Sequence, residues 1–161
     1  MPLYKTISIN TRYKNLIDFT QLTKLRLSIS IVLSSIAGYF LAAEEIDYPS
    51  LVFLIIGGFS MVGASNVFNQ IFEKDLDKKM LRTQNRPLPD GRIQPKTAMY
   101  IGVMLTLIGV VCLYLINLKT AFFACISTFL YACLYTPLKQ KTPLSVFVGA
   151  FPGAIPFMLG W

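Results

Sequence analysis

The chain has 161 residues, of which 54% are hydrophobic and only 14% are charged. An ordinary soluble domain carries about 25% charged residues, so this composition excludes a disordered chain, a coiled coil and a nucleic-acid-binding arm. The charges that are present are unbalanced, with 15 Lys and Arg against 8 Asp and Glu and a net charge of +7. An apolar chain with concentrated basic charge is typical of a membrane protein.

The cysteines give no sign of a covalent or metal-bound framework. All three lie inside apolar runs without a CxxC spacing, and the chain has no His. The sequence therefore predicts neither a disulfide framework nor a zinc site.

The first 24 residues are polar and basic. A signal peptide would place its apolar stretch closer to Met1 and would end in a small-residue cleavage site. Leu16, Phe19, Leu22 and Leu25 recur at helical spacing, which is compatible with a helix lying along the membrane interface. A solvated N-terminal tail is the alternative.

Four continuous apolar stretches are long enough to cross about 30 Å of hydrocarbon as helices, which takes about 20 residues. They cover residues 27–43, 51–72, 98–118 and 121–138, and a fifth stretch runs from 144 to 161. Pro152 and Pro156 are expected to break the fifth, which is tolerated where a segment packs against other helices. The stretches lack the alternation of transmembrane β-strands. The predicted fold class is all-α, a polytopic transmembrane helix bundle with four full spans and a partial fifth.

The basic residues predict the orientation of this bundle. Five Lys and Arg precede or begin the first span, seven lie in residues 73–97 and two follow the fourth span, whereas the other connections hold only Lys119. Because Lys and Arg accumulate on the cytoplasmic side, we expect segment 1–24, loop 73–97 and loop 139–143 to be cytoplasmic.

A polar stripe ends the second span. If the helix continues, Asn69, Glu73 and Asp77 lie at i, i+4 and i+8 and drift by only about 80° in total, with Asn66 one turn deeper and Asp75 on another face. Carboxylate and amide oxygens suit Mg²⁺, which typically binds through one or two carboxylates plus substrate phosphates. The stripe therefore predicts a Mg²⁺-diphosphate site.

The alternative for this stripe is a charged helix end in water. It accounts for the carboxylates but not for Asn66 and Asn69, because polar groups inside an apolar span are costly and usually serve a site or a helix contact.

Further candidate residues lie near the same face. Arg82 and Arg86 are suited to bidentate phosphate contacts, and Tyr135 and Lys139 follow the fourth span. Basic loops and aromatic belts that serve only topology are the alternative.

Together these motifs resemble the intramembrane aromatic prenyltransferase (UbiA) superfamily. Asn69, Glu73 and Asp77 match its N-x-x-x-[DE]-x-x-x-D motif, residues 82–88 match its R-T-x-N-R-P-L segment, and Tyr135 and Lys139 match its Y-x-x-x-K element. The Asn-Gln-x-x-Glu variant and residues 142–161 most resemble the haem-farnesylating branch. Leu25 departs from the proline that the family often has, which weakens any role for the neighbouring Lys24 and Arg26.

The resemblance implies that the farnesyl group of farnesyl diphosphate is transferred to the vinyl group of protohaem IX (haem b), giving haem O for terminal oxidases. It implies Mg²⁺ as cofactor, held by Asn69, Glu73 and Asp77, with haem b as a substrate. Tyr135 is implied to be a hydrogen-bond donor or cation neighbour. The implied diphosphate contacts are Asn66, Arg82, Arg86 and Lys139.

The resemblance also implies a context. Family members have about nine spans and a second acidic motif that this sequence lacks, so residues 1–161 are expected to be the first part of one prenyltransferase domain and inactive alone. The implied location is the bacterial inner membrane, within the lipid bilayer, with haem A synthase or oxidase assembly factors as partners and no nucleic acid.

Two alternatives stay open. The chain could be another superfamily member that prenylates a quinone precursor or chlorophyllide. It could also be a helical membrane subunit without chemistry, which would leave Asn66, Asn69 and the Arg82 segment unexplained.

Overall fold

The structure, a computed structural model, describes residues 11–160, with side chains from Tyr13 onward. Lys5, the Arg12 side chain and Trp161, which entered the predictions on charge and on the fifth span, lie outside the described residues. The described part is helical, as predicted. Its elements are α1 (Thr11–Leu22), α2 (Leu25–Ala42), α3 (Tyr48–Asp77), α4 (Pro95–Ile116), α5 (Leu118–Phe129), the π-helix η1 (Leu130–Tyr135), α6 (Thr136–Leu138) and α7 (Ser145–Gly160).

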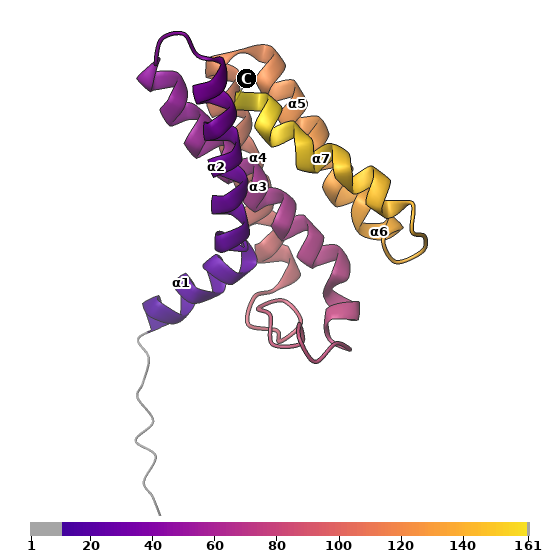
Figure 1. Ribbon diagram of the computed structural model, residues 1–161. Coiled ribbons are helices and arrows are strands. Elements are labelled where there is room, and N and C mark those ends of the chain that lie inside the picture. The colour runs from indigo at the N-terminus through magenta and orange to yellow at the C-terminus, as the bar shows by residue number, and fades with distance from the viewer. Residues whose placement is uncertain (1–10, 161) are drawn as a thin grey trace, which may run out of the picture.

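Four helical stretches are long and apolar enough to span a membrane, namely Leu25–Ala42, Tyr48–Asp77, Pro95–Ile116 and Leu118–Leu138, and α7 is a shorter apolar helix. They confirm the predicted spans to within a few residues, except that α3 is longer. Its 30 residues extend about 45 Å at about 1.5 Å per residue. The extra turns carry the acidic stripe to the end of the bundle where the loop after α3, α6 and the start of α7 also lie (Figure 1).

The two prolines of the fifth stretch do not break it, contrary to the sequence-based expectation. α7 is continuous, and both Pro152 and Pro156 are buried inside it. Pro156 has no N–H to donate to the carbonyl of Pro152, four residues earlier. Ser127 Oγ on α5 donates to that carbonyl oxygen at 3.5 Å. A neighbouring helix therefore satisfies the acceptor that the proline leaves free.

Glycines let the helices approach closely. A Cβ atom added to Gly160 on α7 would lie 1.8 Å from the Ser35 carbonyl oxygen on α2, and one added to Gly38 would lie 2.2 Å from the Phe157 carbonyl oxygen. The backbones of α2 and α7 thus touch directly, as small residues allow in membrane helix pairs.

The predicted N-terminal helix is present as α1, which meets α2 at an angle (Figure 1). Leu22 at its end is buried with Leu88, Val67 and Ala98, whereas Leu16 is 60% exposed. This packing joins α1 to α3, α4 and the loop after α3. Contact of its exposed face with the membrane interface stays a prediction.

Candidate diphosphate and metal site

The acidic stripe lies on one buried face of α3. Asn69, Glu73 and Asp77 are 0%, 7% and 4% exposed, and Asp75 is exposed. The helix faces predicted for these four side chains are therefore confirmed. Their burial requires compensation, because an unpaired carboxylate is costly to remove from water.

Cations from two other segments supply that compensation. Lys139 Nζ, at the end of α6, lies 2.5 Å from Glu73 Oε1. Arg86 Nη1, in the loop after α3, donates to Asp77 Oδ2 at 2.7 Å. Sequence-predicted residues separated by up to 66 positions are thus brought together around one stripe.

A third cation, Lys24, was not predicted to take part. Its Nζ donates to Asn69 Oδ1 at 3.1 Å. Burial lowers the pKa of Lys24 from 10.5 to about 8, repulsion from Arg86 adds to this effect, and attraction by Glu73 opposes it. The site therefore sets three cations against two carboxylates, an excess of positive charge suited to an anionic ligand.

The position of Lys24 depends on side-chain amides of α3. Lys24 adopts a left-handed backbone conformation (φ 49°) between α1 and α2. The carbonyls of Leu22 and Thr23 therefore lack helical partners, and that of Gln21 accepts only a 3.3 Å backbone bond from the Lys24 N–H. Gln70 Nε2 donates to the carbonyl oxygens of Gln21 (3.0 Å) and Leu22 (2.8 Å). Asn66 Nδ2 donates to the carbonyl oxygen of Thr23 at 3.2 Å. These hydrogen bonds stabilise the turn between α1 and α2, and this turn directs the Lys24 side chain toward the stripe.

The predicted diphosphate contacts at Asn66 and Arg82 remain predictions. The amide nitrogen of Asn66 is engaged with Thr23 and, at 3.4 Å, with Ser28 Oγ. Arg82 is exposed and makes no ion pair or side-chain hydrogen bond with the described residues. Within its motif, Arg86 is the arginine that meets the stripe.

A π-helical turn, η1, carries Tyr131 and Tyr135, the aromatic residues of the site. Pro137 cannot donate to the carbonyl of Cys133, and the backbone widens over Leu130–Tyr135. Thr136 Oγ1 donates to the Tyr131 carbonyl oxygen at 2.8 Å and accepts from Asn69 Nδ2 at 3.0 Å. The second bond orients the Asn69 amide so that its oxygen faces Lys24.

The same turn places the tyrosines. The rings of Tyr131 and Tyr135 stack with centroids 5.4 Å apart, and Lys139 Nζ lies 5.5 Å from the Tyr135 ring centroid, within the range of a cation–π contact. The predicted pair of Tyr135 and Lys139 is thus a contact in the structure.

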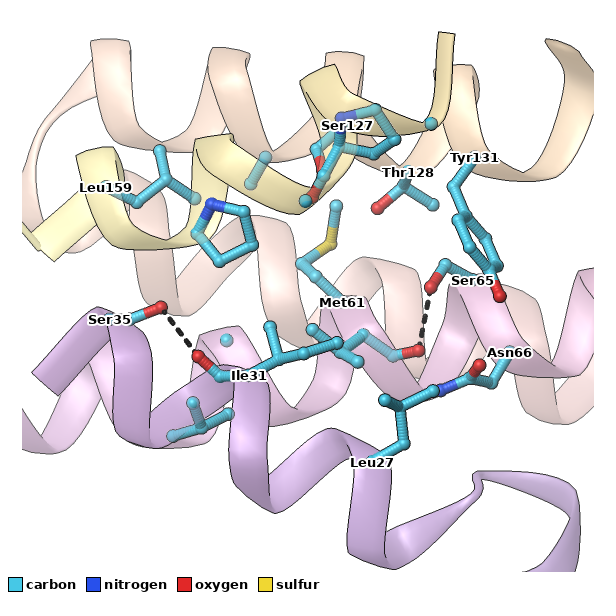
Figure 2. A pocket seen from close by; sticks show the side chains of 18 of the residues that line it. Leu27, Ile31, Ser35, Met61, Ser65, Asn66, Ser127, Thr128, Tyr131 and Leu159 are labelled. Atoms are coloured by element: carbon cyan, nitrogen blue, oxygen red, sulfur yellow. Dashed lines mark hydrogen bonds between the residues drawn. The ribbon is translucent and has the colours of Figure 1, made fainter. Parts of the chain in front are cut away.

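A cavity of about 640 Å³ extends between α2, α3, α4, α5, η1 and α7, and one of its lining residues is Asn66, one helical turn from Asn69 of the stripe. Asn66 and Tyr131 lie at one end and Leu159 at the other (Figure 2). The hydroxyls of Ser35 and Ser65 donate to carbonyl oxygens of their own helices, those of Ile31 (3.4 Å) and Val62 (2.8 Å). The protons of these two hydroxyls are therefore not available to a ligand, and most of the cavity wall is apolar. The polar lining residues Asn66, Tyr131 and Tyr135 lie toward the stripe.

The donor set of the stripe fits Mg²⁺. Residues 11–160 hold no group of three or more His, Cys, Asp or Glu side chains that could bind a metal ion, and the stripe offers two carboxylates, Glu73 and Asp77, and the amide oxygen of Asn69. Mg²⁺ keeps part of its shell for water and substrate phosphates and commonly takes one or two carboxylates from the protein. The stripe thus matches a metal bound jointly with a diphosphate.

The fold and the site define a multi-pass integral membrane protein with a buried acidic stripe and an apolar cavity between its helices. Residues 31–161 match the model of the UbiA prenyltransferase family. The match covers most of the chain, and the chain belongs to this family, as the motifs predicted.

Two curated relatives of this chain share one name. The chain is 60% identical over 157 residues to the protoheme IX farnesyltransferase of Christiangramia forsetii, covering 94% of this chain and 52% of that protein. It is 59% identical over 147 residues to the protoheme IX farnesyltransferase of Flavobacterium psychrophilum, covering 89% and 49%. The chain spans about half the length of the curated relatives it matches.

Solved structures share the fold. A structure from a study of digeranylgeranylglyceryl phosphate synthase gives a TM-score of 0.83 at 25% identity, over 91% of this chain and 52% of that one. A UbiA homolog from Archaeoglobus fulgidus bound to GPP and Mg²⁺ gives a TM-score of 0.77 at 17% identity, over 89% and 52%. The described helices therefore correspond to about half of this fold.

Proposed function

We propose that this chain supplies the prenyl-diphosphate half-site of a membrane prenyltransferase that farnesylates haem b to haem O. The observation that carries the proposal is the stripe of Asn69, Glu73 and Asp77, which is buried among three cations. The stripe lies one helical turn from Asn66, which lines an apolar cavity. A prenyl diphosphate has this same division, an anionic head on a long apolar tail.

The proposed reaction breaks the bond between C1 of the farnesyl group and the diphosphate oxygen, and the electron pair leaves with the diphosphate. The π electrons of a haem vinyl group form the new bond to C1, and water then adds a hydroxyl and releases a proton. Lys24, Arg86 and Lys139 offset the growing negative charge of the leaving group. Tyr135 lies beside Lys139, where its hydroxyl can donate to the diphosphate or its ring can face the allylic cation.

Mg²⁺, when bound by Asn69, Glu73 and Asp77, adds positive charge at the leaving diphosphate. The cavity holds the farnesyl chain and keeps water from the developing cation. Its volume of about 640 Å³ leaves room for the fifteen-carbon chain.

The choice of haem b as acceptor is supported by the names of the relatives. The proposed location in the bacterial inner membrane, with the site on the cytoplasmic side, rests on the four apolar spans and on the excess of Lys and Arg in residues 73–97. Association with haem A synthase or oxidase assembly would pass on a poorly soluble product.

The test joins this chain to the part of the Christiangramia forsetii relative that it does not match. The purified hybrid is assayed with farnesyl diphosphate, Mg²⁺ and either haem b or 4-hydroxybenzoate, and the products are separated by chromatography. Formation of haem O alone is expected. Prenylation of 4-hydroxybenzoate would show that the acceptor is a quinone precursor and not haem b. The absence of product with either acceptor would refute prenyl transfer.

A second arm of this assay tests the stripe. Asp77→Ala is expected to lower kcat/KM by roughly a hundredfold or more, the order of effect of removing one group that stabilises developing charge. Asp75→Asn removes a carboxylate from the exposed face of the same helix turn and is expected to leave kcat/KM unchanged. Equal activity of the two variants would contradict the metal assignment.

A further inference from the structure

The loop after α3, residues 78–94, carries Arg86 and is folded against the bundle. Thr83 Oγ1 donates to the Asp77 carbonyl oxygen at 3.1 Å, and Leu88 is fully buried against Leu22 of α1. The loop therefore has a defined conformation and packs against α1.

Arg92 makes the polar part of these contacts with all three of its guanidinium nitrogens. Nε pairs with Asp90 Oδ2 at 2.7 Å and Nη1 pairs with Asp18 Oδ1 on α1. Nη2 donates to the Asn85 carbonyl oxygen at 2.6 Å and to Gln21 Oε1 at 3.4 Å. One side chain thus connects two parts of the loop, at Asn85 and at Asp90, to α1.

Two of these partners have direct consequences for the site. The Asn85 carbonyl belongs to the peptide that precedes Arg86, so holding it fixes the direction in which the Arg86 side chain leaves the backbone. Asp18 is 5% exposed, and a carboxylate at that burial needs a paired cation. Asp18 lies on the helix that ends just before Lys24.

We propose that Arg92 is a positioning residue, which fixes Arg86 and α1 relative to each other and so holds Arg86 and Lys24 together at the stripe. The inference rests on the proposed function, because these cations are assigned to the diphosphate. Arg86 and Lys24 repel each other, and repulsion would drive a loosely held loop away from α1. The planar guanidinium of Arg92 makes several contacts at once and so holds the loop against α1 despite this repulsion, which a single ammonium group would not do.

The first experiment measures binding of inorganic diphosphate with excess Mg²⁺ to the 161-residue chain in nanodiscs by isothermal titration calorimetry. Arg92→Gln is expected to weaken binding about tenfold, close to the loss of one charge-assisted hydrogen bond. Arg86→Ala is expected to weaken it to a similar extent. Lys96→Gln removes one charge from an exposed position nearby and is expected to have no effect.

The double variant identifies the mechanism. If Arg92 acts through Arg86, adding Arg86→Ala to Arg92→Gln costs almost nothing further, whereas adding Lys139→Ala costs the same factor in either background. Losses of Arg92→Gln and Arg86→Ala that multiply would overturn the proposal.

The second experiment needs no ligand. Amides of Arg86, Asp90 and Ile93 are hydrogen-bonded within the loop, so hydrogen exchange over residues 83–93 reports its order. Arg92→Gln and Asp18→Asn are expected to speed this exchange at least tenfold, and Lys96→Gln to leave it unchanged. Unchanged exchange in the first two variants would refute the positioning role, whereas a wild-type chain that binds no diphosphate would refute the proposed function instead.

Discussion

Lys24 shows how a single residue can be placed by contacts remote in sequence. It lies in a left-handed turn whose carbonyls are held by the amides of Asn66 and Gln70 on α3. Its ammonium is then buried beside Arg86 as well as beside Glu73. The charged form of Lys24 is therefore disfavoured in the folded chain, although Asn69 accepts a hydrogen bond from it.

This environment predicts a dependence of stability on pH. The folded pKa of Lys24 is about 8 and the ordinary value is 10.5, so between these values the unfolded chain holds a proton that the folded chain has released. Stability then rises with pH across this window. Thermal unfolding in nanodiscs, in Mg²⁺-free buffer, is expected to give a higher Tm near the upper end of the window than below it.

Lys24→Met is the control for this prediction, because it removes the titrating group and keeps an unbranched side chain. The difference between wild type and Lys24→Met isolates Lys24 from other groups that titrate in the same range. A difference that does not change with pH would show that Lys24 keeps an ordinary pKa in the folded chain.

Residues of the stripe were predictable and their partners were only partly so. The i, i+4, i+8 spacing was sufficient to place Asn69, Glu73 and Asp77 on one face, because that face follows from helix geometry. The contact between Lys24 and Asn69 spans 45 positions and depends on the turn between α1 and α2. The role of Gln70 could also have been predicted. It is a second amide beside Asn69 inside an apolar span, where a polar side chain usually serves a site or a helix contact.

At the scale of elements, α7 is held by direct backbone contact with α2. Gly160 packs against the Ser35 carbonyl and Gly38 against the Phe157 carbonyl. This contact closes the cavity at the end where Leu159 and Ser35 lie (Figure 2). The small residues at the contact therefore shape the cavity as well as the helix pair.

Gly160→Ala is expected to destabilise the chain by about 1–3 kcal/mol, the usual cost of overpacking. The added Cβ would lie 1.8 Å from a backbone oxygen, which cannot move aside as a flexible side chain can. Thermal unfolding in nanodiscs measures the effect.

The matched control is Gly153→Ala on the same helix, where an added Cβ meets nothing within 4 Å. Alanine is the better helix former by about 1 kcal/mol, so this variant is expected to be as stable as wild type or slightly more so. Equal Tm values for the two alanine variants would contradict the close contact of α2 and α7.

The spans themselves could be predicted from sequence because the lengths of the apolar runs are set by the bilayer. The continuity of α7 could not, because the Ser127 hydroxyl that accommodates Pro156 belongs to another helix. The π-turn at Leu130–Tyr135 likewise needed knowledge of Thr136 and its bond to Asn69. Local rules predicted the elements, and contacts between elements decided their irregularities.

At the scale of the whole molecule, the site and the basic charge share one end of the bundle. Arg86 and Lys139 pair with Asp77 and Glu73 near the C-terminal end of α3, and α6 and the loop after α3 lie at the same end of the bundle (Figure 1). Seven Lys and Arg fall in residues 73–97 alone, against Lys119 as the basic residue of the opposite connections. The same residues thus serve both membrane orientation and the proposed anion site.

This coincidence predicts that the site faces the cytoplasm. Starting from a variant whose three cysteines are replaced by Ser, single cysteines are introduced as Glu45→Cys, between α2 and α3, and as Gln84→Cys, in the loop after α3; both positions are exposed. In intact bacterial cells a membrane-impermeant maleimide is expected to label the first and not the second, because positive charge is retained on the cytoplasmic side. Permeabilising the cells is expected to make both reactive, which controls for accessibility. Labelling of Gln84→Cys in intact cells, with Glu45→Cys protected, would reverse the orientation and place the proposed diphosphate site on the outer side of the membrane.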